Sequence, residues 1–117
     1  MPSDLEKPIP FDSDVGDYRL KINVVPLPPM WDRIKMLHPI SYGLKDQGPT
    51  FKTSTREFWG FNADDLQTAL SSTAATGTKD DTVSYQTSNP WVVIAALTKA
   101  LQEAQARIEA LEINAQS

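Results

Sequence analysis

The sequence contains no cysteine, a single histidine and no long hydrophobic run. Without cysteine, disulfide bonds and thiolate metal sites are excluded. One histidine cannot form a metal centre unless carboxylates surround it, so we expect a structural role for His38 and no metal or cofactor. The longest apolar run, WVVIAAL at 91–97, is far shorter than the ~20 residues of a membrane-spanning helix.

Basic charge is also scarce, because 11 Lys and Arg oppose 15 Asp and Glu, for a net charge of −4. No basic cluster is present, which argues against nucleic-acid or anionic-membrane partners. The glycine-containing runs WGFN and TGTK lack the spacing of a phosphate-binding loop. The N-terminal residues lack the apolar core of a signal peptide, so we expect a soluble protein that is not secreted through one.

Nine prolines punctuate the chain into short segments. The proline-rich and acidic residues 1–15 predict a linker or extended arm. The alternating pattern of 19–27 predicts a half-buried strand ended by Pro26, and a short helix follows at 30–37. The aromatic runs at 40–44 and 56–61 predict paired strands.

Asn62 can cap a helix at 63–70, with Asp64 and Asp65 in its first turn, where the helix dipole favours acids. The residues 71–81 predict a polar loop. The segment 82–86, TVSYQ, predicts another short strand.

The C-terminal helix has the strongest pattern. Asn89 followed by Pro90 is a helix start signal, and no glycine or proline interrupts 91–113. Apolar residues at alternating spacings of three and four occupy the a and d positions of a heptad repeat. These residues are Ile94, Leu97, Leu101, Ala104, Ile108 and Leu111. A helix packed on its own domain gives a similar pattern, but flanking alanines permit close neighbours and favour self-association.

The fold class that follows is α+β: a mixed body of short strands and helices at 16–88 and an oligomerisation helix at 89–117. The a and d residues alone slightly favour two helices over three and do not fix the number. In this register Arg107 occupies a g position and Glu112 an e position. A parallel neighbour brings these opposite charges together, for a few tenths of a kcal/mol at most.

Five short motifs, in this order, resemble those of one known family. They are GDYRLKINV at 16–24, MLHPISY at 36–42, GFNADDL at 60–66, VSY at 83–85 and LTKALQEAQARIEALE at 97–112. No single motif is specific. Together they resemble the C-terminal intramolecular chaperone domain of bacteriophage tailspikes and tail fibres, of the endosialidase type.

The resemblance implies a homotrimer whose C-terminal helices form a bundle or coiled coil. Such a trimer holds the upstream fibre or spike domains of its own chains in register while they fold, in a virion tail assembled in the bacterial cytoplasm. Registration of long-range β structure is slow, so a trimer seed lowers its entropic cost. In many members the domain then cuts itself off: a serine at the first motif position attacks the peptide bond before itself, with the motif lysine as base.

The motif serine position is occupied by Gly16, which has no nucleophile. The other motif residues are retained: Asp17, Arg19, Leu20 and Lys21. Ser13 becomes the nucleophile if VGD is an insertion, with Asp12–Ser13 as the cleaved bond and a desolvated Lys21 as base. Because misplacement by ~1 Å already slows catalysis heavily, we favour a domain that does not cleave itself.

Other candidate residues have simpler interpretations. We interpret the pairs Asp64–Asp65 and Asp80–Asp81 as solvated acids, since adjacent helical residues point in different directions. The aromatic residues Phe58, Trp59 and Phe61 favour core or interface packing. For Trp31 and Trp91, which lie near helix starts, we expect interface packing. The alternative use of the aromatic cluster is a glycan-stacking platform, which would make the domain a host-recognition fibre tip.

Overall fold

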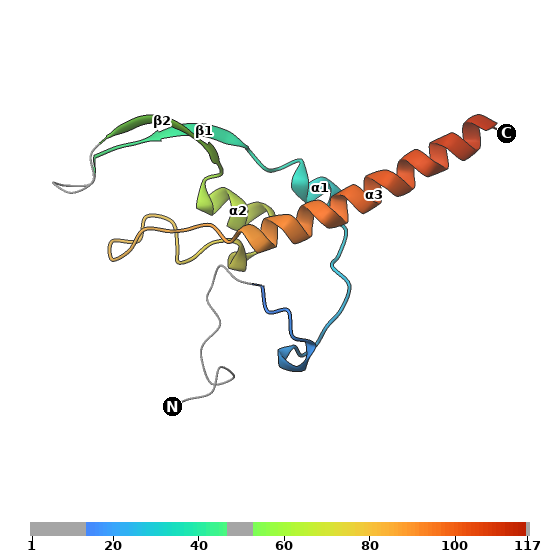
Figure 1. Cartoon of the computed structure of the whole chain (residues 1–117), viewed down its shortest axis with the longest axis horizontal. Coiled ribbons are helices and arrows are strands. Elements are labelled where there is room, and N and C mark those ends of the chain that lie inside the picture. The colour runs from blue at the N-terminus through green and yellow to red at the C-terminus, as the bar shows by residue number, and fades with distance from the viewer. Residues whose placement is uncertain (1–13, 47–52, 117) are drawn as a thin grey trace.

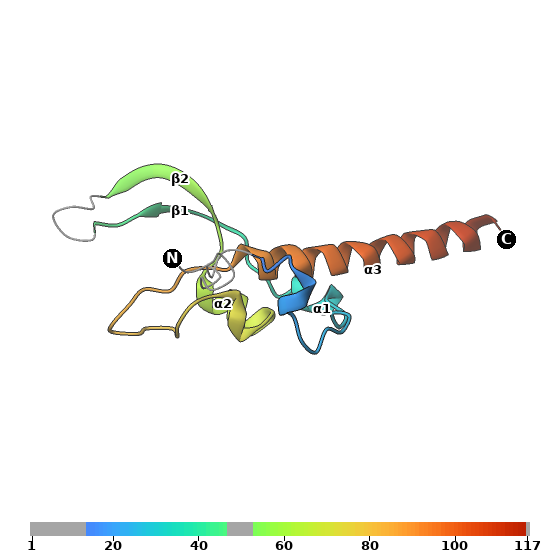
Figure 2. The same cartoon turned by 60° about the horizontal axis from the view of Figure 1, so that its bottom comes forward.

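The computed structural model describes residues 14–46 and 53–116. Its elements are η2 (Tyr18–Leu20), α1 (Trp31–Ile34), β1 (Ile40–Leu44), β2 (Ser54–Gly60), α2 (Ala63–Ala69), η3 (Ser72–Ala74) and α3 (Pro90–Gln116). In Figures 1 and 2, α3 extends from a small body in one direction and the β1–β2 hairpin extends in the other. The predicted mixed body with a long C-terminal helix is confirmed, whereas the helical bundle stays a prediction.

The start of α3 and the hairpin follow the sequence pattern closely. Asn89 accepts a hydrogen bond from the backbone N–H of Trp91 through Oδ1, at 3.1 Å, which is the predicted cap. Strands β1 and β2 pair antiparallel, and Tyr42 lies opposite Phe58 with its ring stacked at 5.7 Å. Strand β2 begins two residues earlier than predicted. The residues between the strands, 47–52, lie outside the described part.

The two short helices also occur where they were predicted. Helix α1 ends at Ile34, earlier than expected, and Met30 occupies its N-cap position. Helix α2 has the predicted start, and the backbone of Asn62 is extended, as an N-cap requires. However, the Asn62 side chain makes no capping hydrogen bond, so that part of the prediction is wrong.

Two predicted strands do not form. In the segment 19–27 the chain makes the 3-10 turn η2 and then an unpaired stretch, in which Asn23 has a left-handed φ of 54°. In the segment 82–86 no strand is present, and Val83 and Tyr85 are exposed. Both segments alternate apolar and polar residues, as a strand does. A half-buried strand also needs a neighbouring strand and an apolar surface to cover it. Among the described residues, neither lies beside these two segments.

The segment 71–81 is more ordered than a polar loop. It contains η3, and both Ala74 and Ala75 are buried. The side-chain amide of Gln67 in α2 donates to the carbonyl oxygens of Ser72, Ala75 and Gly77, at 3.2, 3.2 and 2.9 Å. These bonds hold the segment on α2.

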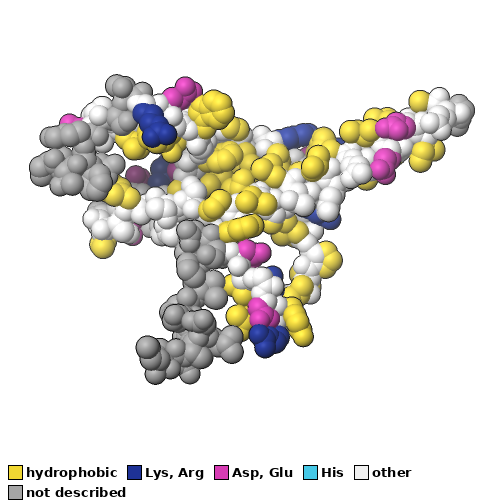
Figure 3. All heavy atoms as spheres, viewed as in Figure 1, with side chains coloured by type: hydrophobic (Ala, Val, Ile, Leu, Met, Phe, Trp, Pro, Cys, Tyr) yellow, Lys and Arg dark blue, Asp and Glu magenta, His cyan; other side chains and the backbone are white. Residues whose placement is uncertain are grey.

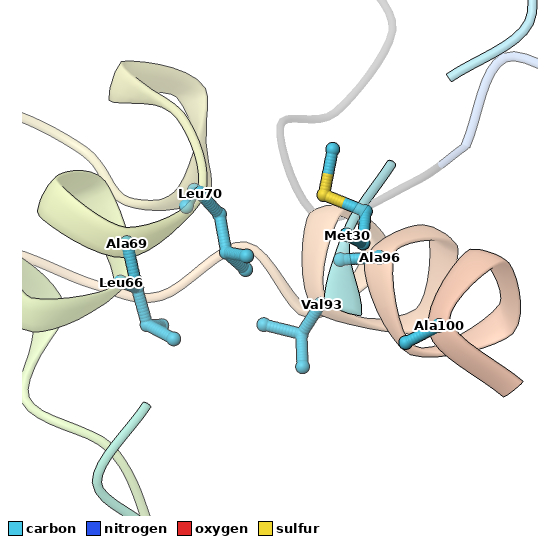
Figure 4. Close-up of a cluster of buried hydrophobic side chains, with 8 residues drawn as sticks. Met30, Leu66, Ala69, Leu70, Val93, Ala96 and Ala100 are labelled. Atoms are coloured by element: carbon cyan, nitrogen blue, oxygen red, sulfur yellow. The ribbon is translucent and has the colours of Figure 1, made fainter. Parts of the chain in front are cut away.

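The core is small and rich in alanine (Figure 4). It consists of side chains from α2, η3, α3 and the residue before α1: Met30, Leu66, Ala69, Leu70, Ala74, Val93, Ala96 and Ala100. Small side chains let the helices approach closely but bury little apolar area. Leu66 is the one large side chain in the described residues that is completely buried.

We predict that Leu66→Ala destabilises the body more than other single truncations. Removing a buried leucine typically costs about 2–5 kcal/mol, a large share of the stability of a small domain. Urea unfolding followed by circular dichroism should show a clearly lower midpoint. Val83→Ala, which truncates an exposed apolar side chain, is the control and should leave the midpoint unchanged. Equal midpoints for both variants would show that Leu66 is not the centre of the core.

The isolated chain exposes an unusually large surface. Its accessible surface is 9722 Å², whereas a compact monomer of 13.0 kDa exposes about 6,300 Å². The radius of gyration is 18.9 Å, against about 13 Å for a compact chain of this length.

Among the described helices none is long and apolar enough to cross a membrane.

Candidate functional site

Helix α3 has two apolar faces with different surroundings. Val93, Ala96 and Ala100 are buried against the body. The residues predicted to form the seam lie on a different face, and the large ones among them, Ile94, Leu97, Leu101, Ile108 and Leu111, are between 45% and 70% exposed. Figure 3 shows hydrophobic side chains continuing along α3 beyond the body.

This arrangement bears on the alternative in which the seam packs on its own domain. The body covers a neighbouring flank of α3 and leaves the seam in solvent. Exposed rows of large apolar side chains are uncommon on monomeric soluble proteins and mark interaction surfaces. The role of the six residues as an oligomer interface stays a prediction.

The joint between α1 and α3 depends on a residue that the sequence pattern did not single out. The two carboxylate oxygens of Glu103 accept hydrogen bonds from the backbone N–H groups of Met30 and Trp31, at 2.8 and 2.9 Å. These N–H groups have no partner within a helix start, so a carboxylate satisfies them well. One turn further along α3, the Arg107 guanidinium lies 4.2 Å from the centre of the Trp31 ring. Glu103 and Arg107 together hold α1 on α3.

The family-like motif at 16–21 is a capped turn. Asp17 accepts a hydrogen bond from the backbone N–H of Arg19 at 3.0 Å, and its side chain forms an ion pair with Arg19 at 2.6 Å. The side-chain hydrogen bond from Arg19, with its backbone bond, lowers the pKa of Asp17, and the same ion pair raises the pKa of Arg19. The motif acid and arginine therefore have a local structural use: they close η2.

The turn changes the expected geometry of the motif. In a strand, residues 16 and 21 would lie about 16 Å apart and on opposite faces. A 3-10 turn rises only ~2.0 Å per residue, so η2 shortens this path. Lys21 is exposed at the end of the turn. Gly16 is also exposed, and Ser13, the alternative nucleophile, lies outside the described residues.

One aromatic side chain of the hairpin is exposed in the single chain. Trp59 is 82% exposed. Its indole N–H donates to Glu57 at 2.7 Å, and the Ser41 hydroxyl donates to the same carboxylate oxygen at 3.0 Å. These two bonds, the indole bond first, lower the pKa of Glu57. Phe61 packs against the core as predicted. Trp59 lies outside the core of the single chain, and its packing in an interface stays a prediction.

His38 and three of the four paired acids, Asp64, Asp65 and Asp81, have partners, so these acids are not simply solvated. His38 Nδ1 lies 3.7 Å from Asp65, and Lys79 Nζ lies 3.6 Å from Asp64. Asp81 accepts a hydrogen bond from the Val83 N–H at 2.7 Å. Within 14–46 and 53–116, no three His, Asp or Glu side chains gather as metal ligands. The His38–Asp65 and Lys79–Asp64 pairs therefore connect neighbouring segments to α2, whereas the Asp81 bond is local to its loop.

The fold and the motif turn define a small α+β domain organised around one long helix. Over residues 16–74 the chain matches the family model described as the chaperone of endosialidase, and this match spans 59 of the 117 residues. The chain belongs to this family, which confirms the resemblance inferred from the motifs and gives it an intramolecular chaperone role in general. No curated protein and no solved structure matches the chain.

Proposed function

We propose that this domain forms a homotrimer through α3 and so registers and helps to fold the upstream chains of a bacteriophage tail fibre or tailspike. The observation that carries the proposal is the exposed seam of α3, beside a flank that the body buries. Burial of one large apolar side chain is worth about 1.5–3 kcal/mol. Five such side chains per copy, brought together in parallel helices, provide enough free energy to hold chains in register.

The β1–β2 hairpin, on the side of the body away from α3, is a second feature that supports a chaperone function. A two-stranded hairpin is marginally stable alone in water. The described sheet contains only β1 and β2, so each strand has one unpaired edge, and the hairpin extends away from α3 (Figure 1). Unpaired edges bind extended chains by strand addition. Helices that set the register and hairpins that contact unfolded β strands together suit a chaperone of a β-rich fibre.

The proposed domain stays attached to its fibre and reaches the virion tail with it. Gly16 provides no hydroxyl at the motif position. The family alternative, self-cleavage between Asp12 and Ser13, predicts loss of the N-terminal residues. The intact mass of the purified chain distinguishes the two, and Ser13→Ala would identify the nucleophile if a cut occurred.

A deletion tests the chaperone function. The upstream fibre sequence is expressed with the domain either complete or ending at Ala104, which removes the outer part of the seam and keeps the buried Val93, Ala96 and Ala100. We expect soluble trimers from the complete chain and aggregated or unregistered chains from the truncated one. Without the helix contacts, the three chains must be aligned by slow long-range pairing alone. Equal yields of correctly folded trimers from both chains would contradict the proposal.

One observation favours a second function, glycan binding at a fibre tip. The exposed Trp59 indole is fixed in orientation by Glu57, as a stacking surface for a sugar ring would be. Trp59→Ala distinguishes the functions: loss of host adsorption by a fibre that still trimerises would favour recognition. A fibre that aggregates or folds slowly would favour strand capture by the hairpin.

A further inference from the structure

We infer that Arg107 connects the body of one copy to the helix of the next: while stacked on Trp31, its guanidinium binds the carboxylate of Glu112 from a second copy. This inference rests on the proposed self-association and adds the contact that fixes its register. The kind of partner is therefore a parallel copy of this chain, aligned without a shift.

The body contacts one flank of α3, beside the seam. With the seam at a and d, the contacts to the body come from c and g positions and from Val92 at an f position. The c and g contacts are made by Val93, Ala96, Ala100, Glu103 and Arg107. The e positions are all exposed: Trp91, Thr98, Gln105 and Glu112. In parallel coiled coils the g flank of one helix faces the e flank of the next. Each body therefore lies beside the free flank of a neighbouring helix.

The Arg107 side chain has a defined position in the single chain. Its guanidinium lies 4.2 Å from the Trp31 ring centre, and the backbone of Trp31 is fixed by the Glu103 carboxylate at 2.9 Å. Among the described residues Arg107 has no ion-pair partner. A stacked guanidinium keeps the N–H groups at its edge available, and its fixed position lowers the entropy lost on binding a carboxylate.

The contact between Arg107 and Glu112 of a second copy can form in one register of the helices. Pairing from g to the following e of a neighbour gives Val93 with Thr98, Ala100 with Gln105 and Arg107 with Glu112. The last is the only pair of charges. A slip of one heptad places Arg107 opposite Gln105 and removes it. The contact therefore disfavours shifted helices, which is the error that a registering domain must avoid.

The strength of this contact also depends on whether the body is folded. Arg107 is stacked only when α1 is docked on α3, and Glu103 docks α1. A copy whose body has not folded would present a freely moving Arg107 and would bind Glu112 more weakly. Chains with folded bodies would thus be selected during assembly.

The test is a charge swap in the full chain, measured as the association constant by sedimentation equilibrium at low salt. Arg107→Glu or Glu112→Arg alone should weaken a trimer about 100-fold, because three pairs become three repulsions. The double variant should return to within about threefold of the wild type, and 1 M salt should shrink all these differences. Gln102→Arg, at an exposed outer b position of the same helix and more than one turn from Arg107 and Glu112, is the control and should leave association unchanged.

A second measurement tests the role of the body. Glu103→Gln keeps the size of the side chain but cannot provide two carboxylate oxygens to α1. In this background the coupling between Arg107 and Glu112 should fall, which a purely interhelical ion pair would not show. The inference is overturned if the double variant does not recover, or if the coupling is the same in both backgrounds. If the wild type itself never associates, the proposed trimer fails as well, and that result is distinct from a trimer indifferent to the swap.

Discussion

Replacing Leu101 by glutamate is expected to abolish self-association while the body stays folded. Leu101 occupies a central a position and is 70% exposed in the single chain, outside the core cluster. In a trimer the variant loses about 1.5–3 kcal/mol of apolar burial per copy and brings three carboxylates together in a dry interface, at several kcal/mol more. The association constant should fall by more than about 10⁴-fold.

Sedimentation velocity gives the oligomer mass for this test, and circular dichroism reports whether the helices persist. Gln102→Glu is the matched control, because it introduces the same charge one residue further along, at a b position away from the seam. It should leave the mass unchanged. An unchanged mass for Leu101→Glu would contradict the seam, and an unfolded body would show that Leu101 packs against its own domain.

Gly16→Ser is expected to produce a chain that cuts itself between residues 15 and 16. A β-carbon built on Gly16 meets no heavy atom of the described residues within 4 Å beyond its chain neighbours, and its φ lies outside the left-handed region, so a serine fits there. The new hydroxyl oxygen would attack the Val15 carbonyl carbon while Lys21 takes the hydroxyl proton. Lys21 returns the proton to the nitrogen of residue 16 as the peptide bond between residues 15 and 16 breaks, and water then hydrolyses the resulting ester. In serine proteases the nucleophile accounts for about 10⁶-fold in rate, so the gain should be large.

Mass spectrometry of the oligomeric variant over several days measures this reaction. Gly16→Ala adds the same carbon without a hydroxyl and should remain intact, as should the double variant with Lys21→Ala. Release of residues 1–15 by Gly16→Ser alone would show that only the nucleophile is missing. An uncut Gly16→Ser chain would show that Lys21 is not positioned as a base in this domain.

The elements that local chemistry determines could be predicted from the sequence. Asn89 and Pro90 mark the start of α3, and its apolar spacing identified the face that the structure leaves exposed. The aromatic runs around Tyr42 and Phe58 predicted the hairpin. In each case the signal lies within a few residues, and no distant partner is needed to interpret it.

The elements that depend on distant partners could not be predicted. Glu103 contacts Met30 across more than seventy residues, and nothing in its surrounding sequence separates it from the other acids of α3. The segment after Lys21 alternates like a strand, but it pairs with neither described strand, since the sheet contains β1 and β2 alone. The motif turn is closed by the Asp17–Arg19 ion pair, which competes locally with an extended conformation. Alternation alone cannot reveal that competition.

The mass of the unmodified chain in solution tests the central claim most directly. Over a wide range of concentrations, the account predicts a single species of three times 13.0 kDa, which dissociates only on strong dilution. A species of one chain mass at the highest concentration, with the α3 seam still exposed to solvent, would contradict it.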